Sequence, residues 1–332
     1  MYLEDLKFSL WCDFVERSFL EGEFVDLIEK KIINGATSNP AIFKSSFLSS
    51  PAYKSDIETL KGKSPKEIYE ALAVEDIKRA AQKLLPLYER GDDGFISIEV
   101  DPNLCDDAEG TIDEGVRLFN EIDMPNVMIK VPATDAGFEA MEALVSKGIN
   151  VNATLIFSNE QSNGCLEAFK NGTKKAKDNG HKIPKAVISI FVSRFDRKLD
   201  PILKEKGLEL SKVGIFNALR IYNSIEKFGL ENVRALFAST GVKGDDLEPD
   251  YYIRELLCYN SVNTAPLNTI KSFLDSQAAE KKVVADMEKI EEFFALLEKN
   301  GIDMRKVNDE LMQEGLEAFK VAFEEIMEAL KS

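Results

Sequence analysis

Histidine is the scarcest residue for chemistry in this sequence, and its scarcity excludes several kinds of active site. Among 332 residues there is one histidine, His181, which stands in the polar stretch DNGHKIP. Metal sites built from several histidines are therefore excluded. A Ser-His-Asp triad is disfavoured, because His181 is expected to lie in a loop. We expect neither a metal nor a cofactor.

Paired cysteines, a signal peptide and long apolar runs are also lacking. The four cysteines, Cys12, Cys105, Cys165 and Cys258, are far apart and form no CxxC pair. Reduced thiols and a cytoplasmic location are the simplest interpretation. The start, MYLEDLKFSLWCDF, has no basic region followed by an apolar one, and no run approaches the roughly 20 apolar residues of a membrane helix. We therefore expect no membrane partner.

Basic residues are outnumbered, and they do not cluster. The chain has 42 Lys and Arg against 58 Asp and Glu, a formal net charge of -16. Proteins that bind nucleic acids gather basic residues to neutralise phosphates, so we expect no nucleic-acid partner. A small anionic metabolite can still bind, because a local pocket of Arg, Lys and amide donors does not depend on the net charge. The oligomeric state stays open, and a homodimer is compatible with the sequence.

Short β-rich runs alternate with longer helical patterns along the whole chain, which indicates a parallel sheet covered by helices. About eight runs qualify as strands, the number that closes a TIM barrel. We therefore expect an α/β fold, a (β/α)8 barrel, with residues 1–332 forming one domain. The expected strands are Phe8–Cys12, Asn34–Ser38, Phe95–Val100, Val127–Val131, Val151–Phe157, Ala186–Val192, Ala235–Ser239 and Ser261–Thr264.

Additional helices are expected beyond those that a minimal barrel needs. Apolar residues at three- and four-residue spacing, such as Ile112, Val116 and Phe119, indicate helices between the strands. The segment from 42 to 89 is longer than one crossover requires, so two or three helices are expected there. Residues 278–332 are helical in pattern and predict a C-terminal extension, packed on the outside of the barrel or across one end.

Almost every expected strand ends in a polar residue that can react or form hydrogen bonds. In a TIM barrel the active site is built at the C-terminal ends of the strands, so these side chains should meet at one mouth. They are Asp13, Asn39, Glu99, Lys130, Asn152, Thr154, Ser189, Arg194, Ser239, Asn263 and Thr264.

Lys130 is the most informative of these residues. In VMIKVPAT it stands between Ile129 and Val131, in a run that must be buried. A buried lysine is costly unless it has a role. Burial favours the neutral amine of a lysine, which is the nucleophile that attacks a ketone to form an imine. The alternative is a structural lysine that pairs with Glu99 or Asp13.

Six segments between Asp13 and Lys243 resemble the strand-end motifs of the transaldolases, members of the class I, Schiff-base-forming aldolase superfamily, in the family's order. They are GATSNPAIF, SIEVDP, MIKVPAT, NVNATLIFS, ISIFVSRFD and ASTGVK. The resemblance implies a transferase of the non-oxidative pentose phosphate pathway whose partners are sugar phosphates. It would move a dihydroxyacetone unit from sedoheptulose 7-phosphate or fructose 6-phosphate to glyceraldehyde 3-phosphate or erythrose 4-phosphate.

The resemblance also implies a role for each strand-end residue. Lys130 would form the Schiff base, and Asp13 would deprotonate the C4 hydroxyl of the donor. Glu99 and Thr154 would hold the water through which the carbinolamine dehydrates. Two carboxylates in different surroundings can divide such proton transfers. Binding of substrate hydroxyls would fall to Asn39, Asn152 and Ser189, and binding of the phosphate to Arg194 and Ser239.

One position departs from the pattern. The better-studied branch of the family has an arginine two positions after the serine that matches Ser239, where this chain has Gly241. Lys243 is close enough in sequence to replace it. The expected phosphate site therefore includes Lys243.

Most of these residues also have a purely structural interpretation. Asp13 and Glu16, in DFVE, fit a helix capping box. A turn anchor would explain Glu99 before Asp101 and Pro102, and a turn would explain Asn39 before Pro40. A tight loop would account for Ser239, and ordinary strand propensity for Thr154.

Three functions besides transfer are compatible with a barrel of this kind. A fructose-6-phosphate aldolase would release free dihydroxyacetone, but in those relatives a tyrosine takes the place of Phe191, and phenylalanine has no hydroxyl to protonate the enamine. A catalytically silent sugar-phosphate binder on the same barrel would need no buried amine. A metal-dependent aldolase is disfavoured by the single histidine.

Overall fold

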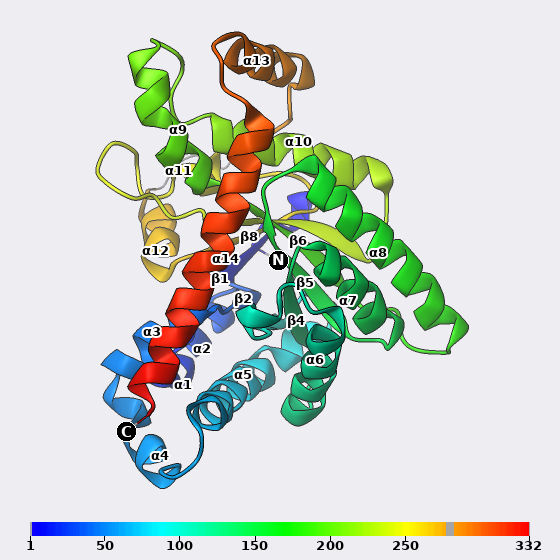
Figure 1. Cartoon of the computed structure of the whole chain (residues 1–332), viewed down its shortest axis with the longest axis vertical. Coiled ribbons are helices and arrows are strands. Elements are labelled where there is room, and N and C mark those ends of the chain that lie inside the picture. The colour runs from blue at the N-terminus through cyan, green and yellow to red at the C-terminus, as the bar shows by residue number, and fades with distance from the viewer. Residues whose placement is uncertain (1, 277–281, 332) are drawn as a thin grey trace.

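The computed structural model describes residues 2–276 and 282–331, and it contains a closed barrel of eight parallel strands in sequential order (Figure 1). β1 (Ser9–Cys12) pairs with β8 (Val262–Ala265) and so closes the ring. The predicted TIM barrel is thus confirmed. The strands between them are β2 (Gly35–Thr37), β3 (Phe95–Glu99), β4 (Val127–Pro132), β5 (Asn150–Ile156), β6 (Ala186–Phe191) and β7 (Val233–Ala238).

The strand bounds differ from the predicted ones by one or two residues. The largest difference is at β7, which begins at Val233 rather than at Ala235. Arg234, the second residue of β7, is partly exposed and lowers the apparent apolar character of the start of that strand. Every residue of the other strands is buried, which explains why continuous apolar runs located them.

Helices connect the strands and surround the barrel. Three α-helices lie between β2 and β3, in agreement with the two or three predicted there. The helices are α1 (Arg17–Glu21), α2 (Glu23–Glu29), α3 (Pro40–Ser49), α4 (Lys54–Thr59), α5 (Pro65–Glu89), α6 (Ala108–Ile122), α7 (Asp135–Ser146), α8 (Asn159–Asp178), α9 (Ser193–Glu205), α10 (Val213–Phe228), α11 (Tyr251–Arg254), α12 (Leu267–Asp275), α13 (Met287–Lys299) and α14 (Met304–Ala329), with short 3-10 turns at η1 (Glu4–Leu6), η2 (Pro51–Tyr53) and η3 (Pro102–Leu104).

The helix after β1 begins later than the capping-box interpretation of Asp13 requires. Its N-cap is Glu16, whose side chain accepts a hydrogen bond from the backbone N–H of Phe19 at 2.8 Å. Asp13 lies three residues before that cap, so the capping interpretation of Asp13 is wrong. Its carboxylate is left for other contacts.

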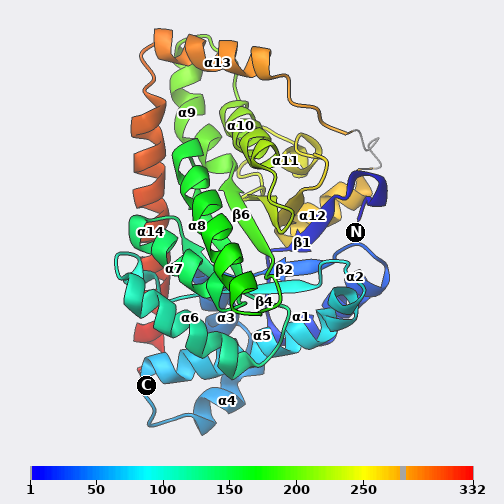
Figure 2. The same cartoon turned by 90° about the vertical axis from the view of Figure 1, so that its right-hand side faces the viewer.

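The two C-terminal helices occupy different places. α13 packs on the outside against α10, where the rings of Phe293 and Phe216 meet edge to face with centroids 5.0 Å apart. α14 runs across the C-terminal end of the barrel, touching α3, α5, α9 and β5, on the side opposite the N-terminus (Figures 1 and 2). The predicted helical extension is thus confirmed for 287–299 and 304–329. Residues 282–286, 300–303 and 330–331 are not helical, and 278–281 and 332 lie outside the described residues. That 1–332 forms one domain stays a prediction.

In the part of the chain that the structure describes, no helix combines the length and apolar character needed to cross a membrane.

Candidate active site

A cavity of about 160 Å³ opens at the C-terminal end of the barrel. Residues from seven strand ends, from α3 and α9 and from α14 contribute to its walls. Seven of the ten predicted site residues line it: Lys130, Asp13, Thr154, Asn39, Ser189, Arg194 and Ser239. The strand-end pattern therefore led to one place in the fold.

Lys130 brings a buried amine to the wall of this cavity. The residue is 5% exposed, and its Nζ lies 3.2 Å from Oε2 of Glu99 and donates a hydrogen bond to the carbonyl of Ser38 at 3.1 Å. β3 and β4 are in register at Glu99 and Lys130, which explains why the two side chains meet. The contact with Glu99 fits a structural ion pair as well as catalysis. The position of the amine on an open cavity favours catalysis, because a structural pair needs no access.

The carboxylates of Glu99 and Asp13 flank Lys130 in different surroundings. Burial raises the pKa of Glu99 above its ordinary value, and the nearby Lys130 opposes that rise. Burial also raises the pKa of Asp13, opposed by Lys130 and by the hydroxyl of Thr37, which donates to Oδ1 of Asp13 at 2.6 Å. Raised pKa values bring both carboxylates closer to the range in which an acid or base works near neutral pH.

The turn after β3 is held by other residues than Glu99. Oε1 of Glu114 accepts a hydrogen bond from the backbone N–H of Asp101 at 2.6 Å, and the side chain of Asp101 caps η3. Because the carboxylate of Glu99 faces Lys130 instead, the interpretation of Glu99 as a turn anchor is wrong.

Thr154 presents a hydroxyl without a partner. Its Oγ1 is fully buried and forms no hydrogen bond with any described residue. Strand β5 is irregular at this point, with a register shift between Ala153 and Ile156 and a φ of +58° at Leu155. A buried orphan hydroxyl beside a strained backbone is unusual and points to a water or a ligand as its partner. Ordinary strand propensity does not account for it.

The amide side chains differ in how far they are free to bind a ligand. Asn152 is fully buried, accepts from Ser189 at 2.6 Å and donates to Ser97 at 3.0 Å. It lies behind the cavity wall and orients Ser189, which does line the cavity. Oδ1 of Asn39 accepts from the N–H of Ile42 and caps α3, so the turn predicted at this position is a helix N-cap.

Arg194 is a largely enclosed cation without an anionic partner. It lies in the first turn of α9, with its guanidinium carbon 5.1 Å from the ring centroid of Phe191. Burial lowers the pKa of Arg194, and among the described residues no hydrogen bond or ion pair reaches it. An enclosed guanidinium of this kind is a ready site for a doubly hydrogen-bonded anion.

The loop after β7 contains the two remaining predicted phosphate contacts. Ser239 lines the cavity with a φ of +54°, and its Oγ lies 3.1 Å from Oγ of Ser193, so the tight-loop interpretation is correct for its backbone. Lys243 is exposed and is not part of the cavity lining. Its predicted role as a replacement for the missing arginine stays a prediction.

Two contributions were missed by sequence reasoning. Phe319 of α14 covers the cavity, with its ring centroid 5.6 Å from Nζ of Lys130. The hydroxyl of Thr37 lies 2.7 Å from that of Thr264 as well as contacting Asp13. Thr37 stands two residues before Asn39 in GATSNPAIF, so alternation along that strand could have found it, whereas nothing near Phe319 in the sequence marks it.

Comparison with known proteins agrees with this geometry. The family described as Transaldolase/Fructose-6-phosphate aldolase matches residues 10–330. A transaldolase of Campylobacter jejuni subsp. jejuni serotype O:23/36 (strain 81-176) is 51% identical over 331 residues, covering 98% of this chain and 99% of that protein. A transaldolase of Helicobacter pylori (strain Shi470) is 45% identical over 322 residues, covering 97% of this chain and 98% of that protein.

Proposed function

Since the chain belongs to the transaldolase/fructose-6-phosphate aldolase family and is a transaldolase-type transferase, we propose that it transfers a dihydroxyacetone unit between sugar phosphates through Lys130. The observation that carries this proposal is the buried amine of Lys130 on the cavity wall, 3.2 Å from Glu99. The donor is a ketose phosphate, sedoheptulose 7-phosphate or fructose 6-phosphate. The acceptor is an aldose phosphate, glyceraldehyde 3-phosphate or erythrose 4-phosphate.

The first half of the reaction forms the imine. The lysine nitrogen adds to the C2 carbonyl carbon of the donor, and the carbinolamine then loses its oxygen as water. This step needs a proton delivered to the departing hydroxyl. In this proposal Glu99 supplies it through a water held by the hydroxyl of Thr154; the 3.2 Å contact of Glu99 with Lys130 and the unpartnered Oγ1 of Thr154 support these roles.

The second half breaks and remakes a carbon–carbon bond. Asp13 takes the proton of the C4 hydroxyl, the C3–C4 bond breaks, and its electron pair moves to C3 and the imine to give an enamine while the aldose leaves. The acceptor aldehyde then reacts with C3, and its oxygen takes the proton back from Asp13. Burial raises the pKa of Asp13, which suits a group that must take up and return a proton.

Substrate binding follows from the remaining residues. Arg194 and Ser239 bind the phosphate, because Arg194 has no other anion and Ser239 stands on the same wall. Asn39 and Ser189 bind hydroxyls, and Asn152 orients Ser189. For Lys243, exposed on its loop, we propose a contact at the rim.

The competing function is simple aldol cleavage with release of dihydroxyacetone. Phe191 lines the cavity next to Arg194 and offers no hydroxyl to protonate the enamine. This favours retention of the three-carbon unit until an acceptor arrives. A silent binding protein is disfavoured by the buried amine.

The test combines trapping with product analysis. The protein is incubated with fructose 6-phosphate and borohydride, and its intact mass and the modified peptide are measured. Incubation with fructose 6-phosphate and erythrose 4-phosphate is then assayed for sedoheptulose 7-phosphate and for free dihydroxyacetone. Transfer predicts a mass gain on Lys130 and the seven-carbon product. Free dihydroxyacetone as the main product would show an aldolase, and no mass gain would show a binder.

Assembly and location extend the proposal. We take the barrel and the C-terminal helices as one domain because Phe319 completes the cavity wall. A homodimer and a cytoplasmic location remain expectations, to be measured by sedimentation and by fractionation of cells.

A further inference from the structure

The N-terminal end of the barrel contains a second and larger cavity, of about 420 Å³. It shares no lining residue with the cavity at the other end. Pockets that bind small organic ligands typically have volumes of roughly 300–1,000 Å³. At this end of a TIM barrel, residues normally serve stability and not chemistry, so an open pocket here has no part in the proposed reaction.

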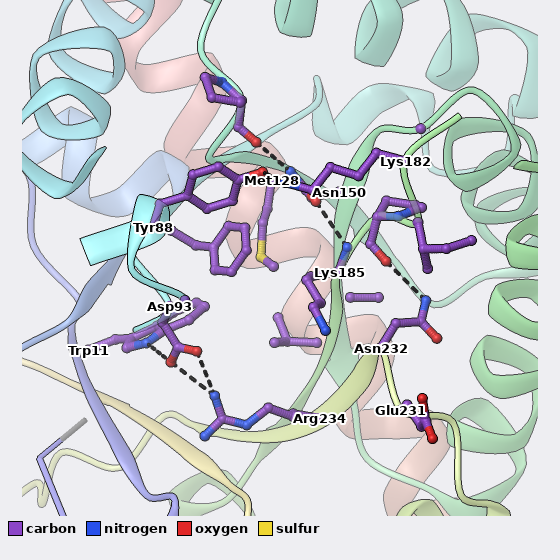
Figure 3. Close-up of a pocket in the computed structure, with 18 of the residues that line it drawn as sticks. Trp11, Tyr88, Asp93, Met128, Asn150, Lys182, Lys185, Glu231, Asn232 and Arg234 are labelled. Carbon is purple, nitrogen blue, oxygen red and sulfur yellow. Dashed lines mark hydrogen bonds and ion pairs between the residues drawn. The ribbon is translucent and has the colours of Figure 1, made fainter. Parts of the chain in front are cut away.

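Four aromatic side chains contribute to this cavity: Trp11, Tyr88, Phe95 and Phe119. The rings of Tyr88 and Phe95 meet edge to face with centroids 5.4 Å apart, and Trp11 lies 6.3 Å from Phe95. Met128 adds a thioether beside them (Figure 3). Trp11, Phe95 and Met128 are almost wholly buried and form the layer behind the wall, whereas Tyr88 and Phe119 are partly exposed to the cavity. Flat apolar rings favour a planar aromatic ligand over a sugar, whose hydroxyls would find few partners among them.

The rim of the cavity carries two cations that no carboxylate neutralises. Lys182 reaches across to Tyr88, donating to its hydroxyl at 2.9 Å with Nζ 4.8 Å from the ring centroid. The amine of Lys185 points toward the middle of the pocket and has no hydrogen bond or ion pair with any described residue (Figure 3). In a chain with a net charge of -16, two such amines over an apolar floor mark a place for an anion.

The other charges and amides of the cavity are already occupied. Arg234 binds both oxygens of Asp93, at 2.8 and 3.0 Å. The amide nitrogen of Asn150 donates to two backbone carbonyls, and that of Asn232 donates to the carbonyl of Pro184. Glu231 is exposed at the edge of the cavity, well away from Lys182 in Figure 3. The two lysines are therefore the groups left to recognise a charged ligand.

We propose that this cavity binds a planar aromatic ligand bearing one anionic group, with the ring against the partly exposed rings of Tyr88 and Phe119 and the anion on Lys182 and Lys185. The anionic group can be a carboxylate or a phosphate, since both suit two amines. The site does not depend on the reaction at the other end of the barrel, so either assignment can fail alone.

Trp11 makes the test direct, because it is the single tryptophan of the chain and is buried immediately behind the cavity wall. The probes are 2-naphthoate and adenosine 5′-monophosphate, with the uncharged 2-naphthamide and adenosine as their counterparts. Titration calorimetry gives affinity and stoichiometry, and tryptophan emission reports the location. We expect at least one of the two anions to bind with a stoichiometry of one. Its affinity should be at least about tenfold higher than that of its neutral counterpart. Its binding should also change the emission of Trp11.

Variants locate the binding. Lys182→Gln with Lys185→Gln should weaken it by about tenfold. The matched control, Lys204→Gln with Lys206→Gln, removes the same charge from exposed positions at the end of α9 and should leave it unchanged. Arg194→Gln should also leave it unchanged. If only 2-naphthoate binds, the site is specific for a carboxylate. If only adenosine 5′-monophosphate binds, the site is specific for a phosphate.

Three results would overturn the proposal. They are no binding of either anion, equal binding of the neutral counterparts, and an affinity that is unchanged when both rim lysines are replaced. Loss of binding in Arg194→Gln would also overturn it, by placing the probe in the other cavity. Melting temperatures of all variants control for folding.

Discussion

The two ends of the barrel use the same residue types in opposite ways. At the N-terminal end Arg234 binds Asp93 through two hydrogen bonds and also donates to the carbonyls of Lys7 and Ser261, at 2.7 and 2.8 Å. Its guanidinium is saturated. At the C-terminal end Arg194 has no anionic partner among the described residues. The hydroxyl of Thr154 forms no hydrogen bond with any of them. We infer that a polar group with all of its partners within the protein, such as Arg234, serves the fold. A polar group without such partners, such as Arg194 or Thr154, is available to bind substrate.

The largest expected effect comes from Lys130→Met, which keeps most of the side-chain volume and removes the amine. We expect loss of borohydride trapping and a fall in turnover of at least about 10⁴-fold, as for other covalent nucleophiles. The fold should persist, because Glu99 and Asp13 already have raised pKa values and can be protonated. Intact mass after trapping, steady-state rates and melting temperature measure these effects. Trapping that survives the substitution would move the Schiff base to another lysine.

The next comparison separates the roles of Asp13 and Glu99, the two carboxylates at the C-terminal end of the barrel. Asp13→Ala should still trap substrate on Lys130 but stall cleavage, because its proton transfer follows imine formation. Glu99→Ala should slow trapping itself. Each loss is expected to cost about 10²- to 10⁴-fold in turnover. Rapid-quench trapping beside steady-state turnover tells them apart. Equal slowing of trapping in both variants would refute this division of roles.

Breaking the Arg234–Asp93 ion pair at the N-terminal end of the barrel should lower the stability of the fold without changing the catalytic rate. Arg234→Met leaves Asp93 mostly buried and without its cation, with 11% of its side chain exposed. We expect a loss of about 3 kcal/mol in the free energy of unfolding, with kcat per folded molecule unchanged. Urea unfolding and active-site titration measure the two quantities. The companion Asp93→Asn, which removes the charge that needs a partner, should be milder. A tenfold fall in kcat would contradict the contrast between the two ends.

A smaller, pH-dependent effect is expected from Asp196, a buried carboxylate held by neutral groups. It accepts hydrogen bonds from the backbone N–H of Gly214 and the hydroxyl of Tyr252, and burial raises its pKa from 3.8 to about 6. The raised pKa means that the folded state holds the proton more tightly. Its stabilising contribution is complete below pH 3.8 and is lost as the pH rises through about 6. A shift of about two pKa units corresponds to about 3 kcal/mol in all, of which about 2 kcal/mol falls between pH 4 and 7.

The variant Asp196→Asn provides the control for that titration. It removes the ionisable group while its side-chain oxygen can still accept from Gly214. The difference in unfolding free energy between variant and wild type, measured by urea denaturation from pH 4 to 7, should therefore grow in favour of the variant. A difference that does not change with pH would show that Asp196 does not titrate in this range.

The barrel could be predicted because its strands, apart from Arg234 in β7, are buried over their whole length and stand out as apolar runs. The same runs end in the polar residues that meet at the mouth, so Lys130, Asp13 and Arg194 followed from position alone. Chain direction and parallel pairing then fix the end at which they gather.

The remaining features depend on contacts between distant parts of the chain. Phe319 reaches Lys130 from a helix that follows the last strand, and no local pattern reports which residue of that helix faces the cavity. The irregularity at Leu155 has no glycine to announce it. Likewise, the helix start at Glu16 was obscured by a capping pattern that fits Asp13 equally well.

The closure of the barrel also has a consequence for the order in which function appears during folding. Asp13 follows the first strand, but its backbone N–H donates to the carbonyl of Ala265 in the last strand at 2.8 Å, and Thr37 meets Thr264 across the same seam. Contacts between the two ends of a chain form late, because the loop they close is long. A refolding molecule should thus regain its helices first and its catalytic rate last, which makes enzyme activity a reporter of barrel closure.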